Sequence, residues 1–320
     1  MIKILRSFVS IICFCSLIFF SLILALNKQF SSFTLDGIKL WLAFVVPALF
    51  PYFFITTILS SMSITSKISS KLSFITKRLF NVNGAVGYAF FMSVISGYPV
   101  GAKIVCDLKE KGLISESESV RASALCSTSS PMFLINSVGN FMFKNTLLGV
   151  ILFLSHFLSA IIIGLIFSFY KRKDKPNEVL INQNKRLDNL LYESAYSSVI
   201  SILVVGAIIT VFYIFSNLLF SLNLLNPIIS IFSLVLGNHT IAKGFVFGLL
   251  ECTQGLKIIS AFNGSLPLCA FICGFGGLSI LMQSIAYLKK AKIKTAPFLI
   301  SKLFGAVLNF LICFIICLFL

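Results

Sequence analysis

Long apolar runs are the feature that most limits what this 320-residue chain can fold into. Several runs reach about 18 residues or more, the length at which a helix crosses a ~30 Å hydrocarbon core. Only 11% of the residues are charged, whereas a soluble domain carries about a quarter. The sequence therefore predicts an all-α polytopic membrane protein whose surroundings are the lipid bilayer.

The excess of basic residues indicates how the chain is oriented in that bilayer. A net charge of +16 would suggest a nucleic-acid partner in a soluble protein. In a membrane protein the preference of Lys and Arg for cytoplasmic loops explains it better, and we expect no nucleic acid. The apolar segments are 8–26, 38–62, 84–106, 120–142, 146–170, 194–222, 227–257, 264–288 and 297–320.

Charges would fall on both sides if every segment spanned the membrane. We expect instead that 84–106 is a re-entrant hairpin from the cytoplasmic side and 227–257 a re-entrant hairpin from outside. The basic residues then lie inside, with the N-terminus, and the C-terminus lies outside. The exceptions, which remain outside, are Lys28, Lys39, Lys144, Lys243 and Lys257.

This topology predicts two inverted repeats, each with a re-entrant broken-helix hairpin, plus an extra N-terminal helix. Each half holds three spans, an odd number, so the second half enters the membrane upside down, as in many transporters. We expect a transmembrane helix in 1–37, the repeats in 38–170 and 194–320, and a cytoplasmic linker in 171–193. Residues 63–83 are predicted to form a basic amphipathic helix on the cytoplasmic surface.

Four apolar segments are interrupted by Gly, Pro, Ser or Thr and cannot continue as regular helices. In hydrocarbon such a break survives only where it is buried in protein or lines a watery cavity. The alternative for any single break is that small residues let helices approach closely. Because each half carries one break in its hairpin and one in the next span, we expect a ligand site. The breaks are Ser96–Lys103, Cys126–Pro131, Gly248–Gly255 and Cys273–Ser279.

The candidate substrate-binding residues come from these breaks. Lys103 and Glu251 are the strongest candidates for functional residues, because placing an ionisable side chain inside a membrane is energetically costly. Lys103 could pair with an anionic substrate or cap its hairpin. Glu251 could carry a coupling proton, bind a cation, or form an ion pair with Lys103 or Lys257. The full set is Ser96, Gly97, Tyr98, Pro99, Gly101, Lys103, Ser127, Thr128, Ser129, Ser130, Glu251, Thr253, Gly274 and Gly276.

Metal and cofactor chemistry is not expected. The cysteines lie almost entirely in apolar segments, and Cys269/Cys273 and Cys313/Cys317 have the helical i,i+4 spacing that zinc and redox motifs do not use. No recognisable hydrolase or metalloprotease motif is present, so we expect a protein that is not an enzyme.

Three stretches resemble one known family. Pro47–Phe53, Ser96–Lys103 and Cys126–Phe133 are similar to the YlbJ (also called SpoVV) family of sporulation integral membrane proteins. That family belongs to the wider nucleoside-recognition or gate domain group, which makes both repeats gate-type. The resemblance covers roughly residues 38–290 and includes the pattern of Gly248, Glu251, Thr253 and Gly255.

The resemblance implies transport of a small organic anion, dipicolinic acid, from the mother cell across the outer forespore membrane during sporulation. We expect Tyr98 to stack on the pyridine ring and Lys103 to meet a carboxylate. A nucleoside or neutral-metabolite transporter and a non-transporting sporulation scaffold are the alternatives. The oligomeric state, a homo-oligomer included, and the coupling ion are left open by the sequence.

Overall fold

Helices form all the regular structure in the part of the chain that the computed structural model describes, residues 21, 29–61, 64–171, 189–262 and 265–319. The predicted helix at 8–26 lies outside these residues apart from Ser21, and the predicted linker lies largely outside them. The first half contains α2 (Phe30–Leu40), η1 (Trp41–Val45), α3 (Val46–Ser61), α4 (Ile64–Phe80), α5 (Gly84–Ser96), α6 (Val100–Glu110), α7 (Glu116–Leu125), η2 (Met132–Met142) and α8 (Thr146–Phe167). The second half contains α9 (Leu190–Ser221), α10 (Asn226–Leu236), α11 (His239–Leu250), α12 (Cys252–Ile259), α13 (Leu266–Phe275), α14 (Gly277–Lys290) and α15 (Thr295–Leu318).

Five helices in the described residues are long and apolar enough to cross a membrane. This confirms the prediction of an all-α polytopic membrane protein. The five correspond to the expected spans at 38–62, 146–170, 194–222, 264–288 and 297–320. They are Phe30–Leu59, Thr146–Phe167, Leu190–Ser221, Leu266–Lys290 and Thr295–Leu318.

The expected span at 120–142 is not one helix. It consists of α7 and η2, separated by an extended stretch at 126–131. Helix α7 starts with a capping box of Ser115 and Glu118 and is polar rather than apolar. Helix α7 ends at Leu125, and Pro131, which lacks a backbone N–H, lies at the start of the next helix, η2. The polypeptide therefore crosses this region as two short helices.

The two halves place the same kinds of element in the same order. A long helix (α2–η1–α3 or α9) is followed by a short amphipathic helix, α4 or α10. A helix pair around a break comes next, α5–α6 or α11–α12. A broken helix, α7–η2 or α13–α14, and a long closing helix, α8 or α15, complete each half. The opposite membrane orientation of the halves stays a prediction.

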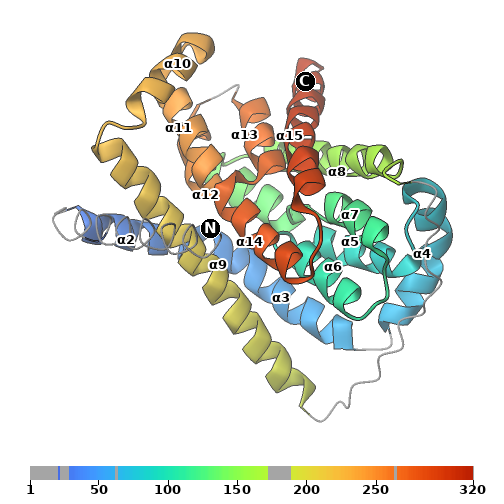
Figure 1. The fold of residues 1–320 in the computed structure, drawn as a ribbon. Helices are drawn as coiled ribbons and strands as arrows, with labels where there is room; N and C mark the ends of the chain where they lie inside the picture. Colours follow the sequence, from blue (N-terminus) through green and yellow to red (C-terminus); the bar gives the residue numbers. More distant parts are fainter. Residues whose placement is uncertain (1–20, 22–28, 62–63, 172–188, 263–264, 320) are drawn as a thin grey trace, which may run out of the picture.

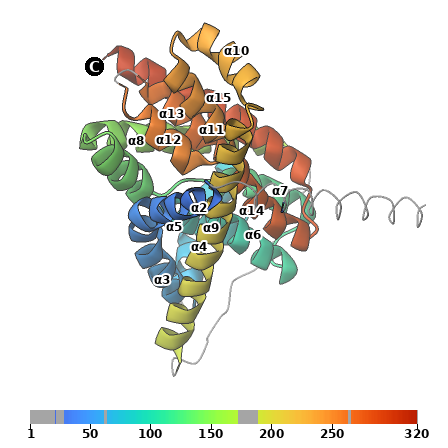
Figure 2. The same cartoon turned by 90° about the vertical axis from the view of Figure 1, so that its left-hand side faces the viewer.

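The long helices surround the broken ones. Helix α9 runs along one side of the molecule against α2 and α3 (Figures 1 and 2). Helices α8 and α15 pack on each other, and α13 packs on α15. Large apolar side chains remain exposed on the outer helices, such as Val211 on α9 (61% exposed) and Phe304 on α15 (60%). Such contiguous apolar surface fits contact with lipid.

Two ion pairs join the loop before α15 to the loop before α7. Lys290 lies 3.5 Å from Glu110, and Lys294 lies 3.2 Å from Glu116. The hydrogen bond from Lys294 lowers the pKa of Glu116 and raises that of Lys294. Both loops were predicted to be cytoplasmic, and their proximity fits that assignment. Helix α10 lies at the opposite end of the molecule in Figure 1.

Candidate functional site

The first hairpin turns at Gly97. Helix α5 ends at Ser96, and Gly97 has a φ of +75°, which a residue with a side chain rarely adopts. The Tyr98–Pro99 peptide is cis, and α6 begins at Val100. A Cβ on Gly97 would lie 2.8 Å from the backbone nitrogen of Ser130. The two breaks of the first half therefore touch.

A second close approach fixes the hairpin to the broken helix. A Cβ on Gly101 would lie 1.8 Å from the carbonyl oxygen of Cys126. The hydroxyl groups of Ser93 and Thr128 are 2.6 Å apart and share a hydrogen bond. At Gly101 and Thr128 the structure thus favours the close-approach interpretation over direct ligand contact.

The break in the second hairpin is shorter than the sequence predicts. Helix α11 continues to Leu250 and α12 begins at Cys252, so Glu251 alone is extended. Its carboxylate, 1% exposed, accepts a hydrogen bond of 2.7 Å from the backbone N–H of Gln254. The Gln254 side chain in turn accepts one of 2.7 Å from Ser216 on α9. Glu251 is therefore the N-cap of α12, where the helix dipole stabilises negative charge.

Glu251 does not have the ion-pair partners that were considered from the sequence. No salt bridge in the described residues joins it to Lys103 or Lys257. The ammonium group of Lys257 lies instead over the ring of Phe44, 5.6 Å from its centroid. The helix end, rather than a lysine, is what offsets the buried carboxylate.

The fourth break is confined to two glycines. Helix α13 continues to Phe275, and Gly276 and Gly277 follow with φ values of +88° and +71°. A Cβ on Gly277 would lie 3.0 Å from the backbone nitrogen of Cys252. The two breaks of the second half are therefore also adjacent, as in the first half.

Three of the four breaks line one cavity of about 40 Å³, which we call the central cavity, and the fourth broken helix contributes residues of α13 and α14 on either side of its break. Six of the predicted residues line it: Gly97, Tyr98, Ser129, Ser130, Glu251 and Thr253. Its other lining residues come from η1, α3 and η2 of the first half and from α9, α12, α13 and α14 of the second half: Val45, Leu49, Phe133, Val205, Ile209, Cys252, Cys273, Ile280 and Gln283.

The remaining predicted residues lie elsewhere. Ser127 and Gly274 line a second cavity of about 20 Å³. Pro99 and Lys103 line a third cavity of about 190 Å³, which shares Val205 and Gln283 with the central cavity. The predicted residues that line none of the three are Ser96, Gly101, Thr128 and Gly276.

Lys302 is the residue that the sequence reasoning missed. It was grouped with the cytoplasmic basic residues, but it lies on α15 with only 3% of its surface exposed. Its ammonium group donates a 2.6 Å hydrogen bond to the Tyr98 hydroxyl. Lys103, by contrast, is only half-buried. The signal was available, because Lys302 falls inside the apolar segment 297–320, where an ionisable residue is expensive.

His156 and Asn309 extend this polar cluster. The Nε2 atom of His156 accepts a 2.9 Å hydrogen bond from the backbone N–H of Ser129. Asn309 lies 3.3 Å from Nδ1 of His156 and donates to the carbonyl of Ala270. His156 is therefore a hydrogen-bonded core residue, and it fixes the Ser129 backbone beside the central cavity.

Gln283 provides an unused polar group at the central cavity. The residue is 5% exposed, and its side-chain nitrogen has no hydrogen-bond partner in the described part of the chain. A buried polar atom without a partner is destabilising, so such an atom in a cavity wall points to a ligand or water.

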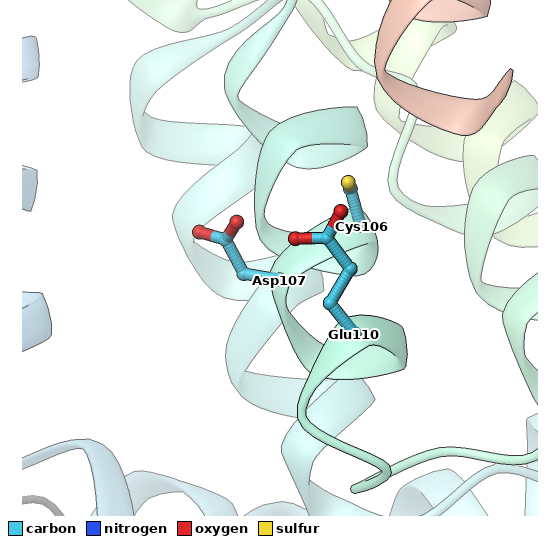
Figure 3. Close-up of side chains that lie close together, drawn as sticks. All are labelled: Cys106, Asp107 and Glu110. Atoms are coloured by element: carbon cyan, nitrogen blue, oxygen red, sulfur yellow. The ribbon is translucent and has the colours of Figure 1, made fainter. Parts of the chain in front are cut away.

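A cluster of Cys106, Asp107 and Glu110 on α6 has three potential metal ligands within 4.8 Å of one another (Figure 3). All three come from successive turns of one helix, and Glu110 already pairs with Lys290. We assign no metal to it, and the expectation of a protein without metal or cofactor stays a prediction.

The central cavity is small. Its volume of about 40 Å³ suffices for a few water molecules at roughly 10–15 Å³ each, and an aromatic ligand needs more room. The two hairpin tips and the two broken helices contribute to its walls.

Comparison with known proteins gives one match. The chain is 28% identical over 302 residues to the sporulation integral membrane protein YlbJ of Bacillus subtilis (strain 168), and the match covers 85% of this chain and 73% of the relative. No family model matches the chain, and no solved structure matches it.

Proposed function

Because the chain belongs to the YlbJ family of sporulation membrane proteins, we propose that it transports a small organic anion, dipicolinate, from the mother cell across the outer forespore membrane. One observation carries the transport proposal: three helix breaks, from both halves of the chain, line a single cavity, and the helices flanking the fourth break complete its wall. Broken helices meeting between two repeats are the way many secondary transporters build their substrate sites. The choice of dipicolinate rests on the family.

The electrostatics of the central cavity favour an anion. Helix η2 begins two residues after Ser130 and α12 begins at Cys252, so two helix N-termini, which carry positive partial charge, lie at residues that line the cavity. Lys302 reaches the Tyr98 hydroxyl in the cavity wall. The opposing charge of Glu251 is engaged by the N–H of Gln254 at the start of α12.

The third cavity supplies a route of entry. It is larger than the central cavity, about 190 Å³ against 40 Å³, and the two have Val205 and Gln283 in common. Lys103 lies in its wall, where a half-buried ammonium group attracts an anion before it enters. Passage then requires the hairpin tip at Gly97–Pro99 to move, since this tip lies between Lys103 and the central cavity.

Flux measurements in proteoliposomes test the proposal. We expect purified protein to exchange radiolabelled dipicolinate across the bilayer and to leave a panel of nucleosides untransported. Uptake of nucleosides without dipicolinate would make the protein a nucleoside transporter. Absence of any flux, together with normal spore dipicolinate in a deletion strain, would leave the scaffold as the better explanation.

A further inference from the structure

Lys302 is a buried ammonium group without a buried counter-charge. Its one side-chain hydrogen bond in the described residues goes to the neutral hydroxyl of Tyr98, at 2.6 Å. The ammonium also lies over the Tyr98 ring, 4.3 Å from its centroid. No carboxylate of the described chain lies within salt-bridge distance of it. Buried charges in proteins are normally paired, because desolvation is costly.

Lys302 and Tyr98 lie at the boundary between two cavities. Tyr98 lines the central cavity, and Lys302 lines the second cavity together with His156, Ser127 and Gly274. The Tyr98 hydroxyl also reaches the carbonyl of Cys273 at 3.4 Å, a long and weak contact. The hydrogen bond between Tyr98 and Lys302 therefore joins the walls of the two cavities, and the Tyr98 hydroxyl is held chiefly by Lys302.

The polar residues next to Lys302 and Tyr98 already have hydrogen-bond partners, whereas the Lys302 ammonium has no carboxylate partner in the described residues. His156 packs edge-on against the Tyr98 ring, with centroids 6.3 Å apart, and is held by the Ser129 backbone and Asn309. Glu251 is the acidic residue that lines the central cavity, and it caps α12. A negatively charged group of a ligand is therefore more stable next to Lys302 than next to the carboxylate of Glu251.

We propose that Lys302 and Tyr98 form a carboxylate-binding subsite for the transported ligand. This inference rests on the proposed transport function and deepens it. A ligand carboxylate takes the ammonium of Lys302 as its counter-charge, and the Tyr98 hydroxyl, released as an acceptor, donates a hydrogen bond to the same carboxylate. The ammonium–carboxylate contact has both partners ionised, and the hydroxyl–carboxylate bond is also charge-assisted, so together they are stronger than the single ammonium–hydroxyl bond they replace.

The proposed subsite recognises the negative charge of a carboxylate, so its test compares two ligands of the same shape that differ in charge. Dipicolinate carries two carboxylates, and pyridine-2,6-dicarboxamide is its neutral counterpart. We would measure binding of both by isothermal titration to purified protein carrying Lys302→Gln, Lys302→Arg or Lys289→Gln. The last is a matched control, because Lys289 is an exposed lysine at the end of α14.

Lys302→Gln is expected to weaken dipicolinate binding by roughly 10- to 100-fold, the usual effect of losing a hydrogen bond to a charged group. The same variant should bind the dicarboxamide at least as well as the wild type does. Lys302→Arg should keep most of the affinity for dipicolinate, and Lys289→Gln should bind as the wild type. Retained dicarboxamide binding also shows that Lys302→Gln is folded.

The outcomes separate this inference from the function it rests on. Equal dipicolinate affinity of the wild type and Lys302→Gln overturns the subsite and leaves the transport proposal standing. If the wild type does not bind dipicolinate but binds another small carboxylate, and Lys302→Gln weakens that binding, the subsite stands and the assignment of dipicolinate as the substrate is wrong. If neither dipicolinate nor a panel of small carboxylates binds, both proposals fall.

Discussion

Replacing Gly101 by alanine should force the first hairpin away from the broken helix beside it. The new Cβ would lie 1.8 Å from the Cys126 carbonyl oxygen and 2.8 Å from the Cβ of Ser93, whereas ordinary contact begins at 3.4 Å. The backbones must therefore separate by about 1.6 Å at this point, because a carbonyl in a packed break has no rotamer with which to yield. This movement would also stretch the hydrogen bond between Ser93 and Thr128.

The energetic effect of Gly101→Ala follows from two opposing terms. Overpacking of a tight core contributes up to about 3 kcal/mol of destabilisation. The better helix propensity of alanine returns about 1 kcal/mol, because Gly101 lies inside α6. The net loss of about 2 kcal/mol should lower the apparent melting temperature by roughly 3 °C, because the unfolding entropy of a chain of this length is about 0.7 kcal/mol/K. Fluorescence-detected size exclusion after heating in detergent measures this shift.

Gly305→Ala is the matched control. The nearest atom to a Cβ on Gly305 of α15 is Cγ1 of Ile163 on α8 at 3.6 Å, an ordinary contact. Its melting temperature should be unchanged or slightly higher, by the propensity gain alone. Equal melting temperatures for Gly101→Ala and the wild type would refute the argument that this glycine holds the hairpin against the break.

Four further predictions follow from the same geometry. Gly255→Ala should destabilise the protein about as much as Gly101→Ala, because its Cβ would lie 2.2 Å from the Cα of Gly248, and heating in detergent tests this too. Glu251→Gln keeps an oxygen to accept from Gln254 but removes the charge from the cavity, so transport should be lost while the amount of protein in the membrane is unchanged. Lys103→Ala should also abolish flux in proteoliposomes, because the third cavity loses its cation; normal uptake by both charge variants would sink the site assignment. Single cysteines at positions 110 and 240 should be labelled by an impermeant maleimide from opposite sides of the membrane, and labelling from one side would contradict the inverted repeats.

Much of the fold could be predicted because its cause is local in the sequence. A run of apolar residues with few charges makes a membrane helix whatever its neighbours are, and five predicted spans lie where the structure has them. Pro99 and Pro131 lie at the starts of α6 and η2, where a residue without a backbone N–H is tolerated, so they mark helix boundaries for a reason contained in the residue itself. The extent of a break is less predictable: α11 and α13 run on through Gly248 and Gly274, since a glycine inside a helix is permitted if its neighbours pack closely.

The candidate site was only partly accessible to such reasoning. The breaks themselves predicted the hairpin tip at Gly97 and Tyr98 and the capping Glu251, which line the central cavity. Thr128 and Gly101 are of the same residue types as residues that line the cavity, but they form contacts between the first hairpin and the broken helix. Lys302 was grouped with the basic residues of the preceding loop because it is close to them in the sequence. The sequence does not show which face of a helix is buried, and Lys302 lies on the buried face of α15.

By itself, the sequence determined that the chain lies in a membrane, that its helices are interrupted at four places, and that the interruptions hold the polar groups. These properties depend on backbone chemistry and hydropathy, which act within a few residues of each position. Only the tertiary structure decided that three of the four breaks line one cavity and that the buried ammonium of Lys302 rests on Tyr98, 204 residues away along the chain. Such contacts depend on how the halves pack together, and a sequence read segment by segment contains no direct record of that packing.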